Sequence, residues 1–353
     1  MSISRPDLDF GRQTLLVRIP GGAASFRLET RTVLVCFAVL LLSLLLAAVA
    51  LATGDFAVPL PEVLRALTGG GDPMTQTVVT QWRLPRVLMA LVLGAALGMS
   101  GAIFQSLTRN PLGSPDIIGF NTGAYTGALL VILAVGGSYW QVAAGALAGG
   151  ILTALAVYLL AFRRGSHGFR LIIVGIGMSA MLAAFNHWLI LQAELEAAMA
   201  AAVWGAGSLN GITWEQAGPA VLVVVVVSAA VLGVSRRMRM LEMGDDAARA
   251  LGVRAEPTRL LLLILGVALT AAATAVAGPI AFVALAAPQL ARRLCGNAGI
   301  SLLPSALLGS LLLVASDLAA QRLFAPIQLP VGVVTVSIGG IYLIWLLARE
   351  ARK

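Results

Sequence analysis

Hydrophobic residues occur along this chain in nearly uninterrupted blocks of about 20, and polar residues are largely confined to the segments between them. At a rise of about 1.5 Å per residue, a helix of that length spans the roughly 30 Å hydrocarbon core of a bilayer. The pattern therefore predicts an all-α, polytopic transmembrane protein with about ten spans. The predicted spans are residues 32–53, 87–107, 117–136, 139–161, 169–192, 217–235, 258–277, 279–291, 302–321 and 331–348. The eighth is short and bracketed by Gly278-Pro279 and Pro288, so we expect it to be tilted or partly re-entrant.

The composition agrees with this prediction, and the basic residues orient the spans. The sequence is 59% hydrophobic and 11% charged, whereas a soluble domain is about 45–50% apolar and about 25% charged. With a cytoplasmic N-terminus, 20 of the 24 Arg and Lys residues fall on the cytoplasmic side, as the positive-inside tendency requires. The four on the outer side are Arg65, Arg83, Arg86 and Arg322. We expect both termini to be cytoplasmic, and we attribute the net charge of +8 to topology and not to nucleic-acid binding.

The chain divides into a polar cytoplasmic N-terminal tail, residues 1–30, and a ten-span transmembrane domain, residues 31–353. We expect the tail to lack regular structure, as terminal segments often do. The outer segment between the first two spans, about 54–82, contains three consecutive glycines and several acids, and we expect a solvated linker. The most arginine-rich cytoplasmic segment is residues 236–256.

A polar stretch within that cytoplasmic segment is too short to span the membrane and predicts two short helices. Gly244 can end the first helix, and Asp245 or Asp246 can cap the second, where acids also favour the positive helix N-terminus. Arg249 can pair with these acids at i+3 or i+4, and Gly252 then ends the helix. We expect a docking element for a cytoplasmic partner, with a plain surface linker as the alternative. Its candidate residues are Leu241, Gly244, Asp245, Asp246, Ala248, Arg249, Leu251 and Gly252.

Few residues point to chemistry performed by the chain itself. The sequence has no phosphate-cradling loop with its lysine, and His167 and His187 have no ligand partners at helical spacing. No nucleophile and base can be paired. We therefore expect no metal and no cofactor on this chain. Asp317 lies about 15 residues into the ninth span, where an acid must face protein or water. We expect a structural hydrogen bond, helped by Arg322, with a pathway role as the alternative.

Three motifs carry a family resemblance. They are R-L-P-R from Arg83 to Arg86, then G-A-x-L-G-x-S-G-x-x-x-Q ending at Gln105, then R-N-P-L-x-x-P-x-x-x-G with Asn110, Pro111 and Pro115. Together they resemble the FecCD/BtuC-type permeases of bacterial ABC importers for iron–siderophore complexes and vitamin B12. A well-packed span followed by its turn is the plainer interpretation of each residue in this stretch.

The resemblance implies a permease subunit in the bacterial inner membrane. Its expected partners are a second, homologous but non-identical permease, two ATPase subunits that bind ATP–Mg, and a periplasmic siderophore-binding protein. The expected cargo is a ferric siderophore, a catecholate such as ferric enterobactin; vitamin B12 or haem is the alternative cargo. An ion-coupled secondary transporter and a membrane enzyme are the alternatives outside the family.

The resemblance also implies roles for individual residues. The motif L-x-M-G-D-x-A-A-x-x-L-G-V resembles the sequence of the family's coupling helices, which fit into a cleft on the ATPase subunit. Arg83 and Arg86 fall where the binding protein docks, and Arg322 follows the family's third arginine by one residue, with headgroup contact or snorkelling as the alternative. The fifth and tenth spans line the family's pathway. Their polar or small candidates are Ser179, Asn186, Thr335, Ser337 and Gly339, and Gln289 stands where the family usually has His.

Overall fold

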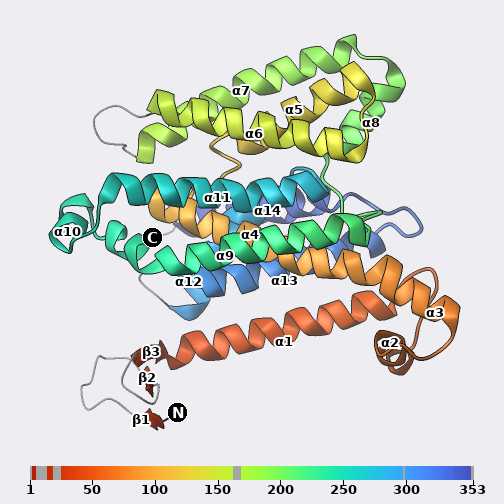
Figure 1. Cartoon of the computed structure of the whole chain (residues 1–353), viewed down its shortest axis with the longest axis horizontal. Helices are drawn as coiled ribbons and strands as arrows, with labels where there is room; N and C mark the ends of the chain where they lie inside the picture. Colours follow the sequence, from red (N-terminus) through yellow and green to blue (C-terminus); the bar gives the residue numbers. More distant parts are fainter. Residues whose placement is uncertain (1, 5–13, 19–24, 162–167, 297–298, 351–353) are drawn as a thin grey trace.

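The computed structural model describes residues 2–4, 14–18, 25–161, 168–296 and 299–350. Ten apolar helices follow the order of the ten predicted spans and lie roughly parallel in one bundle (Figure 1). They are α1 (Thr30–Ala52), α4 (Leu84–Thr108), α5 (Phe120–Val135), α6 (Tyr139–Ala161), α7 (Gly168–Gln192), α9 (Trp214–Glu242), α11 (Ala255–Ala277), α12 (Val283–Cys295), α13 (Leu302–Arg322) and α14 (Val331–Glu350). Among the described residues, seven helices are long and apolar enough to cross a membrane, and α5 and α12 are shorter.

Helix α4 forms the centre of the bundle and packs against α13, α11, α12 and α9. Its glycines allow this, because a side chain at Gly94 or Gly98 would overlap the backbone of α13. Small residues at such spacing let membrane helices approach closely. The buried hydroxyl of Ser100 donates to the Gly266 carbonyl of α11 at 2.8 Å, so a polar contact also joins α4 to α11.

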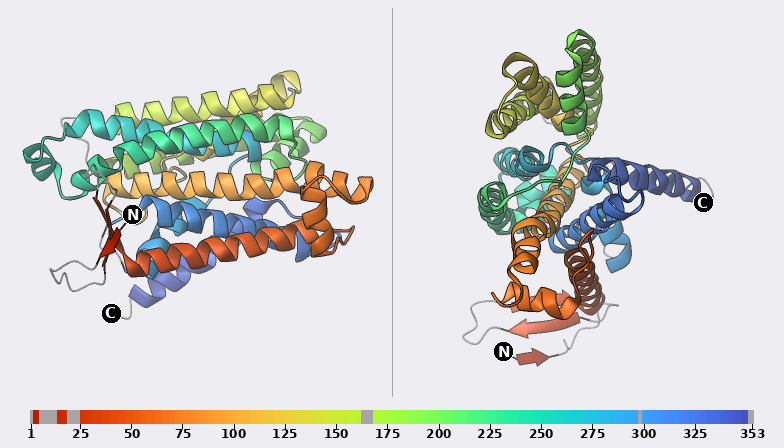
Figure 2. Two further views of the ribbon diagram at one scale, coloured as in Figure 1. Left: turned by 60° about the horizontal axis from the view of Figure 1, so that its bottom comes forward. Right: turned by 90° about the vertical axis from the view of Figure 1, so that its right-hand side faces the viewer.

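Helices α5, α6, α7 and α8 (Leu195–Gly205) form a second group beside the larger one (Figure 1). Helices α5 and α6 meet at another glycine contact, since a side chain at Gly127 would overlap the Gly145 backbone. The end-on view in Figure 2 shows α14 projecting from one side of the bundle. Its first turn is tied to the end of α8 by the Gly332 amide, which donates to the Gly207 carbonyl at 3.0 Å.

The two ends of the bundle differ. The short helix α10 (Asp245–Ala250) and strands β1 (Ser2–Ser4), β2 (Thr14–Arg18) and β3 (Ser25–Glu29) lie at one end, whereas α2 (Leu60–Leu67), α3 (Pro73–Thr77) and α8 lie at the other (Figure 1). The strands form an antiparallel sheet in the order β1-β2-β3, with Ser2 paired to Arg18 and Thr14 to Glu29. The prediction that the tail lacks regular structure is therefore wrong for these described strands.

The outer segment after α1 is also more ordered than predicted. It contains α2, α3 and a π-helix, η1 (Val78–Arg83), that continues into α4. Val58, Val63 and Ala66 are buried against the end of α1 and the start of α4. Helix α2 is amphipathic, and its apolar side chains cover the apolar ends of α1 and α4. A solvated linker would leave that surface exposed.

The predicted eighth span corresponds to α12, which has 13 residues and is too short to cross a bilayer by itself. It begins after Phe282, whose φ of 69° is unusual for a residue with a side chain. The Phe282 amide donates to the Asp116 carboxylate at 3.2 Å, so the loop between α4 and α5 holds the start of α12 in place. Pro288 lies inside α12 and does not end it.

Candidate functional site

The segment between α9 and α11 forms one short helix, α10, and not the two that the sequence predicts, because α9 stays helical to Glu242. Gly244 supplies the break with a φ of 114°, and Gly252 ends the next turn with a φ of 82°. The prediction that Asp245 or Asp246 caps the helix is wrong, since the N-cap position is Gly244 and has no side-chain cap. Arg249 does pair with Asp246 at i+3, at 3.2 Å.

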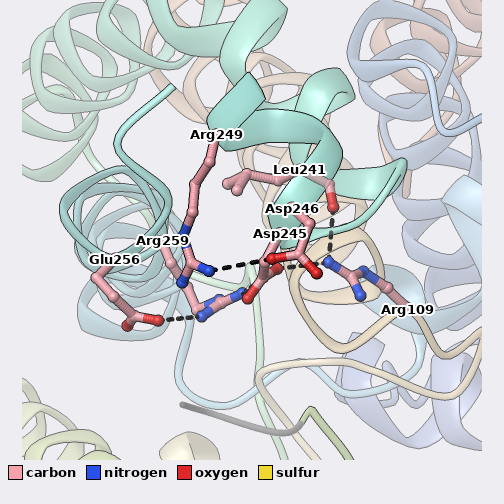
Figure 3. A network of polar contacts seen from close by, with 7 residues as sticks. All are labelled: Arg109, Leu241, Asp245, Asp246, Arg249, Glu256 and Arg259. Carbon is pink, nitrogen blue, oxygen red and sulfur yellow. Dashed lines mark hydrogen bonds and ion pairs between the residues drawn. The ribbon is translucent and has the colours of Figure 1, made fainter. Parts of the chain in front are cut away.

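Asp245 clamps α10 to the body of the protein (Figure 3). Arg259 Nη2, on α11, lies 2.9 Å from Asp245 Oδ1 and 3.0 Å from Oδ2. Arg109 Nη2, in the turn after α4, lies 2.7 Å from Oδ1 and also donates to the Leu241 carbonyl at 2.9 Å. Glu256 accepts from the other nitrogen of Arg259 at 2.9 Å. One carboxylate thus joins α10 to two different parts of the bundle.

The clamp keeps its charge at neutral pH. Partial burial alone would raise the pKa of Asp245, but the hydrogen bonds and positive charges of Arg259 and Arg109 outweigh it, and the pKa lies below its ordinary value. A carboxyl whose pKa is lowered by folding stabilises the fold above its unfolded pKa. That contribution is lost progressively as the pH falls from the unfolded pKa through the lower folded pKa.

Several side chains on and beside α10 point away from the bundle and take no part in the Asp245 ion pairs. Met243 is 69% exposed and Leu251 57% exposed, and Asp246 and Arg249 are also exposed. Leu241 and Ala248 are buried and hold the helix against α9 and its neighbours. We call the exposed set, Met243, Asp246, Arg249 and Leu251, the coupling surface. It combines apolar and charged side chains on α10 and in the residues that flank it, and the Asp245 ion pairs and the buried Ala248 hold α10 against the bundle.

Sequence reasoning missed Arg109 and Arg259 as members of this site. Arg109 is 136 residues from Asp245, so no local spacing connects the two. A signal was available in the hairpin motif, which places an arginine at the end of α4. Arg109 has a left-handed conformation there, with a φ of 49°, which ends the helix and directs the following chain into the turn.

The other motif residues hold this hairpin against α12. Gln105 is 1% exposed and donates to the Leu285 carbonyl at 3.0 Å. Gln289, which replaces the family's usual His, donates to the Gln105 side chain and to the Pro111 carbonyl. Asn110 accepts from the Leu112 amide at 2.8 Å and shapes the turn, and Pro115 is buried. These contacts match the packing interpretation of the motif.

At the end of the bundle opposite α10, two of the three predicted docking arginines have internal partners. Arg83 donates to the carbonyls of Leu51, at 2.7 Å, and Phe56, and so caps the end of α1. Arg86 forms a bidentate ion pair with Asp317 on α13. The prediction that Arg322 helps to bind Asp317 is therefore wrong. Arg322 is exposed, and its side chain makes no hydrogen bond or ion pair with any other residue that the structure describes.

The predicted pathway residues do not share one surface. Ser337 is exposed, whereas Asn186 and Thr335 are each 3% exposed, and Gly339 packs against the Phe282 ring. Ser179 donates to the Gly175 carbonyl at 2.8 Å and lies against α5. Asn186 does line an open cavity of about 380 Å³ between α5, α7 and the end of α8, together with Tyr125 and His187. His167 lies outside the described residues.

The model of the FecCD transport family matches residues 39–349. The chain belongs to the FecCD transport family. It is 57% identical over 303 residues to the ferric enterobactin transport system permease protein FepG of Escherichia coli strain K12, covering 86% of this chain and 92% of that protein. It is 35% identical over 320 residues to the achromobactin transport system permease protein CbrC of Dickeya dadantii strain 3937, covering 88% and 90%.

The fold agrees with this membership of the FecCD family. A solved metal-chelate type ABC transporter in an inward-facing conformation matches with a TM-score of 0.80 and 30% identity, covering 89% of this chain and 99% of the other. The helical membrane-permease fold and the predicted family are confirmed, and the expectation of about ten spans is roughly consistent with the ten apolar helices. As a FecCD family member the chain is a transport permease and not an enzyme.

Proposed function

We propose that this chain is a permease subunit of an inner-membrane ABC importer that moves a ferric catecholate siderophore, ferric enterobactin, from periplasm to cytoplasm. The observation that carries the proposal is the 57% identity to FepG over 303 residues. Strand β1 and the end of α14 lie at the same end of the bundle as α10 (Figure 1), which supports a cytoplasmic placement of that end. The arginine distribution favours the same orientation.

The importer has three kinds of partner in this proposal. A second, non-identical permease covers the side from which α14 projects, and two ATPase subunits hydrolyse ATP–Mg. The coupling surface enters a cleft on one ATPase, and the Asp245 clamp passes its movement to α4 and α11. A siderophore-binding protein docks at the outer end, where Arg322 is exposed and acidic side chains would find an unpaired guanidinium. Exposed charge pairs act mainly on encounter rate and orientation.

The proposed transport is tested by reconstituting the chain in vesicles with its cognate second permease, ATPase and binding protein. We expect uptake of radiolabelled ferric enterobactin to require ATP and to continue when an ionophore collapses the ion gradients. Vitamin B12 and haem, each tested with the same components, serve as the alternative cargoes. Uptake that stops with the ionophore while ATP is maintained would instead indicate an ion-coupled transporter.

The pathway side can be tested with single cysteines. Ser337 on α14 and Leu152 on α6 are both exposed in the isolated chain, at a polar and an apolar position. We propose that Ser337 faces the aqueous path between the permeases and that Leu152 faces lipid. In the assembled importer, S337C should react with a charged, water-soluble thiol reagent in at least one nucleotide state, and L152C should not. Protection of S337C in every state would contradict the pathway assignment.

A further inference from the structure

The outer end of the bundle contains a buried ion pair between α4 and α13. Asp317 is 1% exposed, and its carboxylate receives three donors. Arg86 Nε lies 2.9 Å from Asp317 Oδ2, Arg86 Nη2 lies 2.9 Å from Oδ1, and Gln321 donates to Oδ2 at 2.8 Å. The carboxylate uses the Nε–Nη2 edge of the guanidinium, so the orientation of the Arg86 side chain is fixed.

The remaining nitrogen of Arg86 points to a different part of the chain. Nη1 donates to Gln328 Oε1 at 3.1 Å, at an exposed position. Gln328 lies three residues before α14 begins at Val331. The segment between α13 and α14 is otherwise weakly held at its tip, where Leu323 is 64% exposed and Ile327 68% exposed. Arg86 therefore connects the ends of α4 and α13 to the segment that leads into α14.

We propose that Arg86, positioned by Asp317, is a latch on the start of α14 that a carboxylate of the docking binding protein opens by displacing Gln328. The proposal rests on the proposed docking of the siderophore-binding protein at this end. An arriving carboxylate competes with a neutral amide oxygen for Nη1, and it adds to the hydrogen bond an attraction between opposite charges that the amide lacks. Gln328 is therefore the partner that yields, whereas the buried Asp317 pair keeps its geometry.

Release of Gln328 from Arg86 would loosen the residues that lead directly into α14. The Leu329 amide donates to the Ala320 carbonyl at 3.0 Å, and the Gly332 amide donates to the Gly207 carbonyl at 3.0 Å. Val331 is buried, so the first turn of α14 is firmly packed, whereas Ile327 and Gln328 just before it are exposed and the bond to Arg86 is what holds the Gln328 side chain. Helix α14 carries Ser337 of the proposed pathway. The Arg86 side chain would thereby link docking of the binding protein to movement of α14. Asp317 and Gln328 act in this scheme as positioning residues for Arg86.

The decisive variant is Gln328→Leu, which removes the acceptor and leaves the ion pair intact. The matched control is Gln81→Leu on the same outer end, because Gln81 is exposed and its side chain has no hydrogen bond to any described residue. Both are assayed as complete importers in nanodiscs with binding protein loaded with ferric enterobactin. We expect Q328L to keep the association rate of Q81L within about twofold. The ratio of ATPase activity with and without binding protein should fall about fivefold or more.

A second pair of variants separates positioning from stability. Asp317→Asn alone leaves the partly buried Arg86 guanidinium, 14% exposed, without its countercharge and should reduce the yield of folded importer. The double variant Arg86→Gln with Asp317→Asn removes both charges together and should restore the yield. If the pair only stabilises the fold, the double variant will also restore the stimulated ATPase ratio, and the latch is wrong. If Arg86 is the latch, the ratio stays low although the protein folds.

The same measurements distinguish a failure of the proposed docking from a failure of the latch. An association rate that is unchanged by Arg322→Glu and by ionic strength would contradict the proposed docking, and the latch with it. A rate that responds to both, combined with equal ATPase ratios for Q328L and Q81L, would overturn the latch alone and leave the docking in place.

Discussion

Replacing Asp245 with Asn should uncouple this permease from its ATPase, whereas the same change at the neighbouring Asp246 should have little effect. Asp245 accepts from both Arg109 and Arg259, and its removal frees α10 from α4 and α11. Asp246 is fully exposed and, among the residues that the structure describes, pairs only with Arg249, at 3.2 Å within the same helix. Coupling free energies between sites are typically about 1–3 kcal/mol, so we expect transport to fall about 5- to 150-fold in D245N.

The measurement is uptake of ferric enterobactin per ATP hydrolysed in reconstituted vesicles. The D246N variant is the matched control, since it removes the same charge from the adjacent residue and breaks one exposed i,i+3 pair of small value. Asp245→Lys should have a larger effect than D245N, because it places a cation against two arginines. Equal transport-to-hydrolysis ratios for D245N and D246N would show that the clamp carries no coupling.

The two acids also show where sequence reasoning ended. Local spacing correctly predicted the i+3 pair of Asp246 with Arg249 and the glycine breaks on either side of α10. It could not rank Asp245 above Asp246, because the arginines that distinguish them come from other elements of the fold. The error at Asp317 has the same cause. Arg322 is near in sequence, whereas the actual partner is Arg86, 231 residues away.

The helices themselves were more predictable. Hydropathy placed residues 139–161, and α6 spans those same residues, because a block of apolar residues in a bilayer satisfies its backbone only as a helix. It ended the sixth span near residue 235, although α9 continues to Glu242. Arginine is a good helix former, so the helix extends past the membrane with no hydropathy signal. At α12, the left-handed Phe282 delays the helix start, and only the Asp116 contact explains that conformation.

Adding one methyl group to Gly101 should disrupt the bundle more than the same change elsewhere. A Cβ atom at Gly101 would overlap the Ala284 carbonyl oxygen of α12, and the nearby backbone offers no side chain that could move aside. The residue four positions after Ala284 is Pro288, which has no N–H to donate to that carbonyl. The close approach of α4 therefore covers a carbonyl that its own helix cannot satisfy.

Gly177 on α7 provides the control, because a Cβ there meets no atom within 4 Å. Replacing a helical glycine by alanine normally stabilises a helix by about 0.5–1 kcal/mol, so G177A should match or exceed the stability of the parent. Overpacking a close contact typically costs about 1–3 kcal/mol, and here the two backbones must separate. We expect G101A to lower the thermal midpoint of the detergent-solubilised importer and the yield of folded protein. A midpoint for G101A equal to that of G177A would show that α4 and α12 can move apart without loss, and that the glycine contacts of α4 do not determine the packing of the bundle.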